Sequence, residues 1–367
     1  METVADAARF DRLEAEWNDA VVRAGMPHPF LRHEWLRTWW ECFGGDRRLH
    51  IVIVRSGGRI TGIAPLMEET AWMCGVRVRR LRLMQNDHTP RADFIVTEQG
   101  DREYRAIWRA LAETRERWDV LLLGQLPHDS RTREALGALA EDDSGTIGVW
   151  RSSDSPYVEL HGTWDEYLGR LPGKFRQNLR NRISRLRRIG EPALESIDGE
   201  AALDDAFDDS VRLEASGWKR REGTAIASDP VVHRFYGLLA KRAAARGWLR
   251  LIFLTVSGRR IASSYSLCYE RRLFLCKTGY DPTFETCSPF KVLTYLALGR
   301  AFEEGVEEVD FLGETEPWKL EWTQTARSHD WVFLFSNSSR ARLVYPLKFL
   351  MVPAFRSAKT FALHALR

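Results

Sequence analysis

The stretch that decides the fold is LFLCKTGYDPTFETCSPFKVLTYLALGRAFEEGVEEVDFLGETEPWKLEW, residues Leu273–Trp322. It predicts in turn a strand, a loop, a helix and a second strand, at Leu273–Tyr280, Asp281–Cys287, Pro289–Glu304 and Val306–Leu312. Ser288 stands at the expected N-cap, and Pro289 suits the first helical position because its missing N–H needs no partner there. A strand that opens onto a helix N-terminus offers free N–H groups and a positive dipole end, which together suit a phosphate.

Composition predicts a globular protein of two domains. The chain has 367 residues, of which 44% are hydrophobic and 29% charged, and its net charge of +3 is too small to require a nucleic acid or a membrane as partner. Its five cysteines are odd in number and form no CxxC or Cys/His ligand pattern, so we expect neither a disulfide framework nor a metal site. The N-terminus does not resemble a signal peptide and no apolar run reaches a membrane span, so we expect a cytoplasmic protein.

Two passages of the first half recur in the second half. IVIVRSGGRITGIAPL aligns with LIFLTVSGRRIASSYSL, which places Ile60 over Ile261, and VLLLGQL aligns with VDFLGET, which places Gly124 over Gly313. Each half is thus predicted to be an antiparallel meander followed by a helix and a further strand. We interpret this as a tandem duplication with a degenerate N-terminal half (1–150), a second half with the functional site (151–335), and a basic helical extension (336–367).

Four short segments, taken together, resemble a known family. They are WKRREGTAI at Trp218–Ile226, GYDPTF at Gly279–Phe284, the pair Ser288-Pro289, and DFLGETEPWKLEW at Asp310–Trp322. Over roughly residues 8–335 the chain resembles the CelD-like branch of the GNAT acyltransferases, which is associated with exopolysaccharide and cellulose biosynthesis. It is more distantly similar to the Fem aminoacyltransferases and the leucyl/phenylalanyl-tRNA–protein transferases. The resemblance implies an α/β (α+β) fold of tandem GNAT-like halves, with mixed, mostly antiparallel sheets flanked by helices.

The activity that the resemblance implies is direct transfer from acetyl-CoA or another acyl-CoA to an amine or hydroxyl. The acceptor would be a sugar, an amino compound or a polysaccharide precursor, and no acyl-enzyme or metal is needed. The anchor for the pyrophosphate would be the helix start, with Ser288, Pro289, Phe290 and Lys291 as its residues. The family usually has Gly where this chain has Phe290, and a glycine lets the backbone come closer to a pyrophosphate.

The catalytic candidates are Asp310 and Lys319. Asp310 could orient the acceptor or take its proton, and Lys319 could donate to the developing oxyanion. The alternative is an ordinary ion pair between the two that fixes the strand end. For the acceptor, the resemblance implies contacts from four residues, namely Trp218, Lys219, Tyr280 and Asp281, although Trp218 could instead pack under the sheet.

Cys287 precedes the helix N-terminus, a position that lowers a thiol pKa, but direct transfer needs no cysteine.

Two basic segments leave further alternatives open. The predicted helix Lys174–Arg188 carries seven positive charges and no acidic residue. It could be a surface helix docked by its apolar stripe, or it could bind an anionic acceptor, the CoA 3′-phosphate or RNA. Binding of RNA would suit an aminoacyl-tRNA-dependent transferase, the main rival activity, and a non-catalytic regulator of polysaccharide assembly is a third hypothesis. The basic, apolar segment Arg340–Arg367 could pack on the body or lie on a membrane surface.

Overall fold

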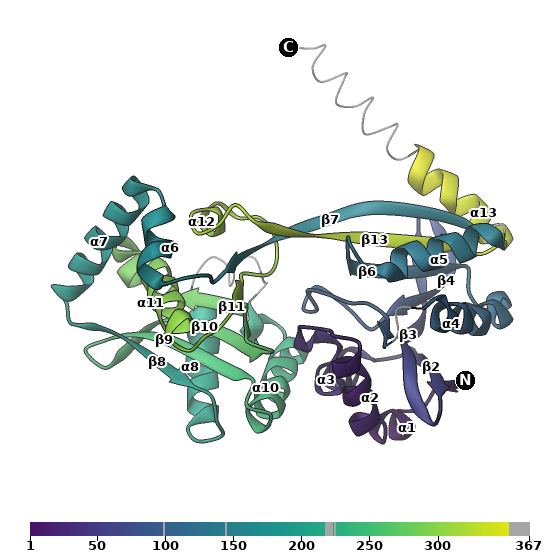
Figure 1. The fold of residues 1–367 in the computed structure, drawn as a ribbon, viewed down its shortest axis with the longest axis horizontal. Coiled ribbons are helices and arrows are strands. Elements are labelled where there is room, and N and C mark those ends of the chain that lie inside the picture. Colours follow the sequence, from purple (N-terminus) through teal and green to yellow (C-terminus); the bar gives the residue numbers. More distant parts are fainter. Residues whose placement is uncertain (98–99, 144, 217–222, 224, 352–367) are drawn as a thin grey trace, which may run out of the picture.

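The computed structural model consists of two α/β halves that share one long sheet (Figure 1). The structure describes residues 1–97, 100–143, 145–216, 223 and 225–351. These residues form a sheet of 13 strands in the order β1-β2-β3-β4-β6-β13-β7-β12-β11-β10-β9-β8, with β5 paired to β3 at the side. The sheet is mixed and mostly antiparallel, as the sequence predicts.

The first half is a meander followed by a helical crossover. Its strands are β1 (Glu2–Val4), β2 (Arg48–Ser56), β3 (Arg59–Met73), β4 (Val76–Leu83), β5 (Ile95–Val96) and β6 (Val120–Pro127). Its helices are α1 (Ala7–Asp11), α2 (Glu14–Arg23), α3 (His33–Phe43), α4 (Asp101–Glu113) and α5 (Arg131–Asp142), with 3-10 turns at Pro29–Leu31 and Arg115–Arg117. β2, β3 and β4 are antiparallel neighbours, and β6 returns parallel to β4 after α4.

The second half repeats this pattern. Its strands are β8 (Pro192–Ile197), β9 (Leu249–Val256), β10 (Arg259–Tyr269), β11 (Arg272–Tyr280) and β12 (Glu308–Asp310). Its helices are α6 (Trp164–Arg170), α7 (Gly173–Arg187), α8 (Leu203–Ala215), α10 (Pro230–Ala245), α11 (Pro289–Glu303) and α12 (Pro317–Leu320), with 3-10 segments at Ile226–Ser228 and Pro282–Cys287. Here β9, β10 and β11 are antiparallel, and β12 returns parallel to β11 after α11. The internal sequence repeat therefore corresponds to a structural repeat.

Two long strands, β7 (Thr146–Glu159) and β13 (Ala326–Phe335), join the halves across the top of the view in Figure 1. β13 follows the second half in sequence but pairs with β6 of the first, whereas the end of β7 pairs with β12 of the second. The two strands also pair with each other along most of their length. Neither strand was predicted from the sequence.

A shared aromatic core lies between the halves. α3 packs against α10, and Trp35 and Trp39 of α3 are buried there. The ring of Trp35 meets Phe235 edge-on at 5.6 Å, and Phe30 meets Phe274 at 5.3 Å. The tryptophan-rich segment around residue 35 is thus core packing that fixes the two halves to one another.

Beyond the sheet, α13 (Ser339–Pro346) and a π-helical turn, η5 (Leu347–Met351), pack on β13 and β4. Helix α11 begins at Pro289 as predicted, but β12 covers only Glu308–Asp310 of the predicted strand Val306–Leu312. None of the helices in the described ranges is long and apolar enough to span a membrane.

Candidate active site

The central feature of the second half is the point at which β11 and β12 part. They pair in parallel only from Arg272 to Phe274 on β11, because β12 ends at Asp310. β11 continues to Tyr280 with β10 on one side, so among the described strands its other edge has no partner from Leu275 onward. Backbone N–H and C=O groups on such an edge can bind an extended ligand that carries amide groups.

A cavity of about 390 Å³ lies where this edge meets the start of α11. It brings together five of the predicted site residues, namely Tyr280, Ser288, Pro289, Phe290 and Lys291. The other walls come from the end of α8, through Leu213 and Glu214, and from the segment around α12, through Glu316 and Trp318. The predicted cofactor-binding residues therefore do line one cavity.

The start of α11 differs in detail from the prediction. Ser288 is the N-cap, but its backbone is left-handed (φ 48°) and its hydroxyl makes no capping bond. The N–H groups of Lys291 and Val292 both donate to the Ser288 carbonyl, at 3.0 and 3.3 Å. These two N–H groups are thus already hydrogen-bonded within the protein. The backbone here attracts an anion mainly through the positive end of the helix dipole.

Phe290, the residue that replaces the family's glycine, packs on α12. Its ring meets Trp318 edge-on at 5.0 Å, and Trp318 in turn meets Phe311 at 5.5 Å. Phe290 therefore lines the cavity and also joins α11 to α12.

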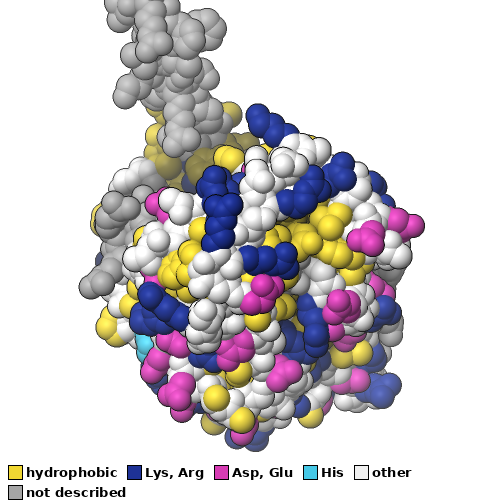
Figure 2. Space-filling model, turned by 90° about the vertical axis from the view of Figure 1, so that its left-hand side faces the viewer, with side chains coloured by type: hydrophobic (Ala, Val, Ile, Leu, Met, Phe, Trp, Pro, Cys, Tyr) yellow, Lys and Arg dark blue, Asp and Glu magenta, His cyan; other side chains and the backbone are white. Residues whose placement is uncertain are grey.

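The cations near this helix start come from α7 as well as from Lys291. The Nζ atom of Lys291 is neutralised by Glu321, whose Oε1 lies 2.8 Å away. Arg182 and Arg185 of α7 instead donate to the carbonyl of Thr286, at 2.6 and 3.0 Å. Figure 2 shows Lys and Arg side chains gathered on the upper part of this end of the molecule, with exposed hydrophobic side chains between them.

Asp310 is fully buried at the junction of the two halves. Its Oδ2 accepts from Arg91 of the first half and, at 2.9 Å, from Arg327 of β13. Its Oδ1 accepts from the hydroxyl of Ser155 at 3.1 Å and from the amide of Leu312 at 2.9 Å. The structure thus places Asp310 in a network that holds four chain segments together.

Lys319 does not join that network as an ion-pair partner of Asp310. Its buried Nζ donates to the carbonyls of Leu312 and Glu314, at 2.7 and 2.8 Å, and lies 3.1 Å from the carboxylate of Glu316. Burial lowers the pKa of this ammonium group. All three of its protons are thereby engaged in closing the loop between β12 and α12.

A second cavity, of about 230 Å³, lies between the halves. Cys276 and Lys277 of β11 line it, directly before the β11 residues that line the α11 cavity, and His88 faces them from the first half. Burial, followed by the charge of Lys277, lowers the pKa of His88 to about 4, so its imidazole is neutral near pH 7. Its Nδ1 lies 3.4 Å from the hydroxyl of Tyr236.

His329 lines the same cavity and is also neutral. Burial, with Arg91 next, lowers its pKa to about 4, and its Nε2 accepts from Arg91 Nε at 3.2 Å. The sequence analysis did not find His88, Arg91, Arg327 or His329. His88 and Arg91 lie far from the quoted segments, whereas Arg327 and His329 follow the last of them closely, and no local pattern distinguishes any of the four from other polar residues.

The remaining predicted site residues are dispersed. The carboxylate of Asp281 caps the 3-10 segment after β11 by accepting from the amide of Thr283 at 2.9 Å, and it pairs with Arg259. Cys287 is buried. Trp218 and Lys219 lie outside the described residues.

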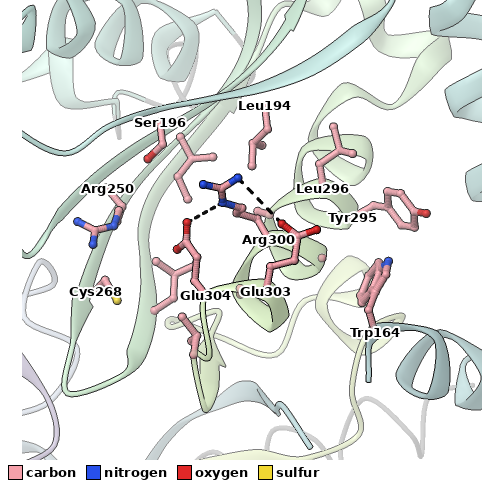
Figure 3. Close-up of a pocket in the computed structure, with 16 residues that line it drawn as sticks. Trp164, Leu194, Ser196, Arg250, Cys268, Tyr295, Leu296, Arg300, Glu303 and Glu304 are labelled. Carbon is pink, nitrogen blue, oxygen red and sulfur yellow. Dashed lines mark hydrogen bonds and ion pairs between the residues drawn. The ribbon is translucent and has the colours of Figure 1, made fainter. Parts of the chain in front are cut away.

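A larger cavity, of about 520 Å³, lies along the other end of α11 (Figure 3). Arg300 pairs there with Glu304 on its own helix at 2.7 Å, and Trp164 and Tyr295 form an aromatic wall. None of the predicted site residues lines it. Within the described ranges, no group of three or more His, Cys, Asp or Glu side chains could hold a metal ion.

Comparisons with known proteins agree with this architecture. Residues 173–320 match the model of an acetyltransferase (GNAT) domain, and a comparison with curated sequences gives no match. The crystal structure of FemX has a TM-score of 0.59 and 12% identity, over 90% of this chain and 97% of that one.

Two further solved structures have the same architecture. The C-terminal domain of a protein named as a lysylphosphatidylglycerol synthetase from Agrobacterium fabrum gives a TM-score of 0.53 and 13% identity, over 92% of this chain and 95% of that one. L-PGS from Bacillus licheniformis gives a TM-score of 0.52 and 13% identity, over 89% and 96%. The protein therefore has the GNAT fold, built as two tandem halves, and its second half contains the segment that matches the acetyltransferase domain.

Proposed function

We propose that the protein is an acyl-CoA-dependent acyltransferase that transfers its acyl group directly to an amine or hydroxyl. The acceptor would be a sugar, an amino compound or a polysaccharide precursor, in keeping with the CelD-like resemblance. The observation that carries the proposal is the parting of β11 and β12 directly beside the start of α11. This arrangement provides an open strand edge for the amide-containing arm of CoA and a positive helix end for its phosphates.

The reaction requires no group on the protein to become acylated. The acceptor nitrogen or oxygen bonds to the thioester carbonyl carbon, the C–S bond breaks, and CoA leaves as the thiolate. The proton lost by the acceptor passes to the thiolate or to solvent. The protein's contribution is to orient the two substrates, because correct placement alone lowers the barrier by several kcal/mol, roughly 7–11 in favourable cases.

The phosphates of the donor would lie between α11 and α7. Lys291 is already neutralised by Glu321, whereas Arg182 and Arg185 donate to the Thr286 carbonyl. Among the described residues these two arginines have no carboxylate partner, so no other anion would compete with a bound phosphate for their guanidinium groups. We therefore assign them, with the α11 dipole, the role of holding the phosphates.

The acceptor would enter through the cavity between the halves. That cavity and the α11 cavity follow one another along β11, so substrates in the two could meet at the strand edge. His88, kept neutral by burial and Lys277, is placed there to accept a hydrogen bond from the acceptor. Asp310 and Lys319, the predicted catalytic pair, would act by holding this region in shape.

The first experiment is calorimetric titration of the purified protein with acetyl-CoA, longer acyl-CoAs and CoA. Replacing both arginines, Arg182→Ala with Arg185→Ala, should weaken binding about tenfold or more, because each charge-assisted bond to phosphate contributes over 1 kcal/mol. Arg187→Ala is the matched control, since Arg187 lies on the same helix but pairs with Glu191 at 3.2 Å. Absence of binding by every acyl-CoA would exclude the proposed donor.

If a donor binds, thiol release is measured with a panel of amines and sugars. Turnover that requires an acceptor supports transfer. Binding without turnover for any acceptor would favour the regulatory, non-catalytic hypothesis instead.

A second candidate is an aminoacyl-tRNA-dependent transferase. It is favoured by α7, which carries six cations and no carboxylate and reaches the start of α11 through Arg182 and Arg185. Titration with bulk tRNA distinguishes the two activities. Binding that is stronger than that of any acyl-CoA and falls steeply with salt would favour this candidate.

A further inference from the structure

The C-terminal helical segment formed by α13 and η5 has two apolar faces. One face is buried against the sheet of the first half, where Ala341 and Val344 are inaccessible to solvent. The ring of Phe349 packs there against Phe333 at 5.5 Å and against Trp150 of β7 at 5.4 Å. The segment is therefore fixed to the body and is not a loosely attached tail.

Gly148 on β7 is shaped for this docking. A Cβ atom at this position would lie 2.3 Å from Cζ of Phe349, so only glycine leaves room for the ring. The start of the segment is fixed as well. Ser338 accepts from the amide of Ala341 at 3.1 Å and donates to the buried Asp119 at 2.8 Å. These contacts set which side of the segment points away from the protein.

The outward side is also apolar. Leu343, Leu350 and Met351 are 52%, 61% and 46% exposed, and their spacing places them on one side of a helix. A segment with hydrophobic residues on all sides is expected to have both faces covered. The first half of the protein covers the inner face, so we expect the outer face to contact another molecule.

Charge indicates what that partner is. Residues 339–367 contain no acidic side chain and six basic ones, namely Arg340, Arg342, Lys348, Arg356, Lys359 and Arg367. A second copy of the chain would bring two such segments together, and their like charges would repel. An anionic lipid surface satisfies both features, because it accepts apolar side chains below its headgroups and attracts a basic segment.

We propose that α13 and η5 form a peripheral docking surface for an anionic lipid bilayer. Leu343, Leu350 and Met351 enter the interface, and Arg342 lies at headgroup level. The Trp150 indole of β7, which the Nζ of Lys348 covers at 3.5 Å, lies beside η5. This inference does not depend on the proposed acyl transfer, since it rests on a different element of the fold.

The test is flotation of the full-length protein with vesicles of phosphatidylcholine, alone or mixed with phosphatidylglycerol. We expect binding to the mixed vesicles only, and weaker binding as salt rises. The double variant Leu343→Glu/Leu350→Glu should weaken vesicle binding about tenfold or more, because it removes two inserted side chains and adds two negative charges. Val22→Glu/Val231→Glu is the matched control, since these valines are 57% and 42% exposed on other helices.

Three outcomes would overturn the proposal. The first is equal binding to neutral and anionic vesicles, and the second is equal loss of binding in both double variants. The third is a dimer in sedimentation equilibrium that Leu343→Glu/Leu350→Glu dissociates, because the outer face would then be an interface between two copies. Thermal melting of both variants serves as the check that folding is retained.

Discussion

The buried carboxylate of Asp310 joins the two halves of the protein through Arg91. The sequence predicts Asp310 and Lys319 as catalytic residues, with an ion pair between the two as the alternative. In the structure the Asp310 carboxylate contacts Arg91, which lies 219 positions away, and Arg327 of β13, and Lys319 closes a loop instead. Residue type and local position are visible in a sequence, but a partner more than 200 positions away is not.

The first prediction concerns this carboxylate. Asp310→Asn should lower the free energy of unfolding by about 3 kcal/mol, because the buried guanidinium of Arg91 loses the charge that compensates it, whereas Arg327 keeps Glu308 as a partner. Urea unfolding provides the measurement. Asp154→Asn is the control, since Asp154 pairs with Arg151 on the surface at 3.1 Å and should cost about 1 kcal/mol at most. Equal effects for the two variants would contradict the structural role of Asp310.

Asp93 gives a prediction about pH. Burial raises its pKa from 3.8 to about 6, even though the amide of Phe94 donates to it at 2.7 Å. Between these two pH values the unfolded chain has already lost the proton that the folded chain keeps. The stability that Asp93 contributes is therefore complete below about pH 4 and is lost as pH rises through about 6, a change of about 3 kcal/mol.

Asp93→Asn removes this titration, so its stability relative to the wild type should rise by about 3 kcal/mol from pH 4 to pH 7. Urea unfolding of both proteins across this range gives the difference directly, which cancels the titration of other groups. A difference that stays constant with pH would show that Asp93 titrates normally.

At the scale of elements, the approach of α8 to β11 depends on Gly279. A Cβ atom there would lie 2.3 Å from Cα of Glu214, so any side chain would push the helix away from the strand. Gly279→Ala should therefore lower the free energy of unfolding by about 1–3 kcal/mol. In the control Gly169→Ala, the new methyl group meets no atom within 4 Å, so thermal melting should show little change. Similar melting temperatures for the two variants would mean that α8 shifts to accommodate the new methyl group at little cost in stability.

The elements themselves were predictable where their pattern is local. α7 and α11 begin and end close to their predicted positions, because apolar spacing, Pro289 and Gly305 act within a few residues. The hydroxyl of Ser288 does not cap α11, however, since the preceding 3-10 segment forces this residue into a left-handed conformation. The Ser-Pro pattern predicts the position of the N-cap but not its backbone conformation, which depends on the preceding turn.

At the scale of the whole molecule, the first half is incomplete without the last strand. β13 lies between β6 and β7, so its removal would leave two strand edges unpaired. A chain that ends before Ala326 should be insoluble or should fail to unfold cooperatively. A chain that ends at Met351 keeps every strand that the structure describes and should unfold in one transition. Circular dichroism during thermal unfolding compares the two, and cooperative unfolding of the shorter chain would show that β13 is dispensable.

The sequence by itself determined the repeat of two halves and the start of α11 at Pro289, which depend on periodicities and turn residues that act over short distances. Its resemblance to a known family indicated the α/β fold class. Only the tertiary structure decided that β7 and β13 join the halves, that Asp310 pairs with Arg91 and Arg327, and that Arg182 and Arg185 of α7 lie beside Thr286. The physical reason is that strand pairing and buried charge pairs form between segments far apart in the chain, where many partners are chemically equivalent and packing selects among them.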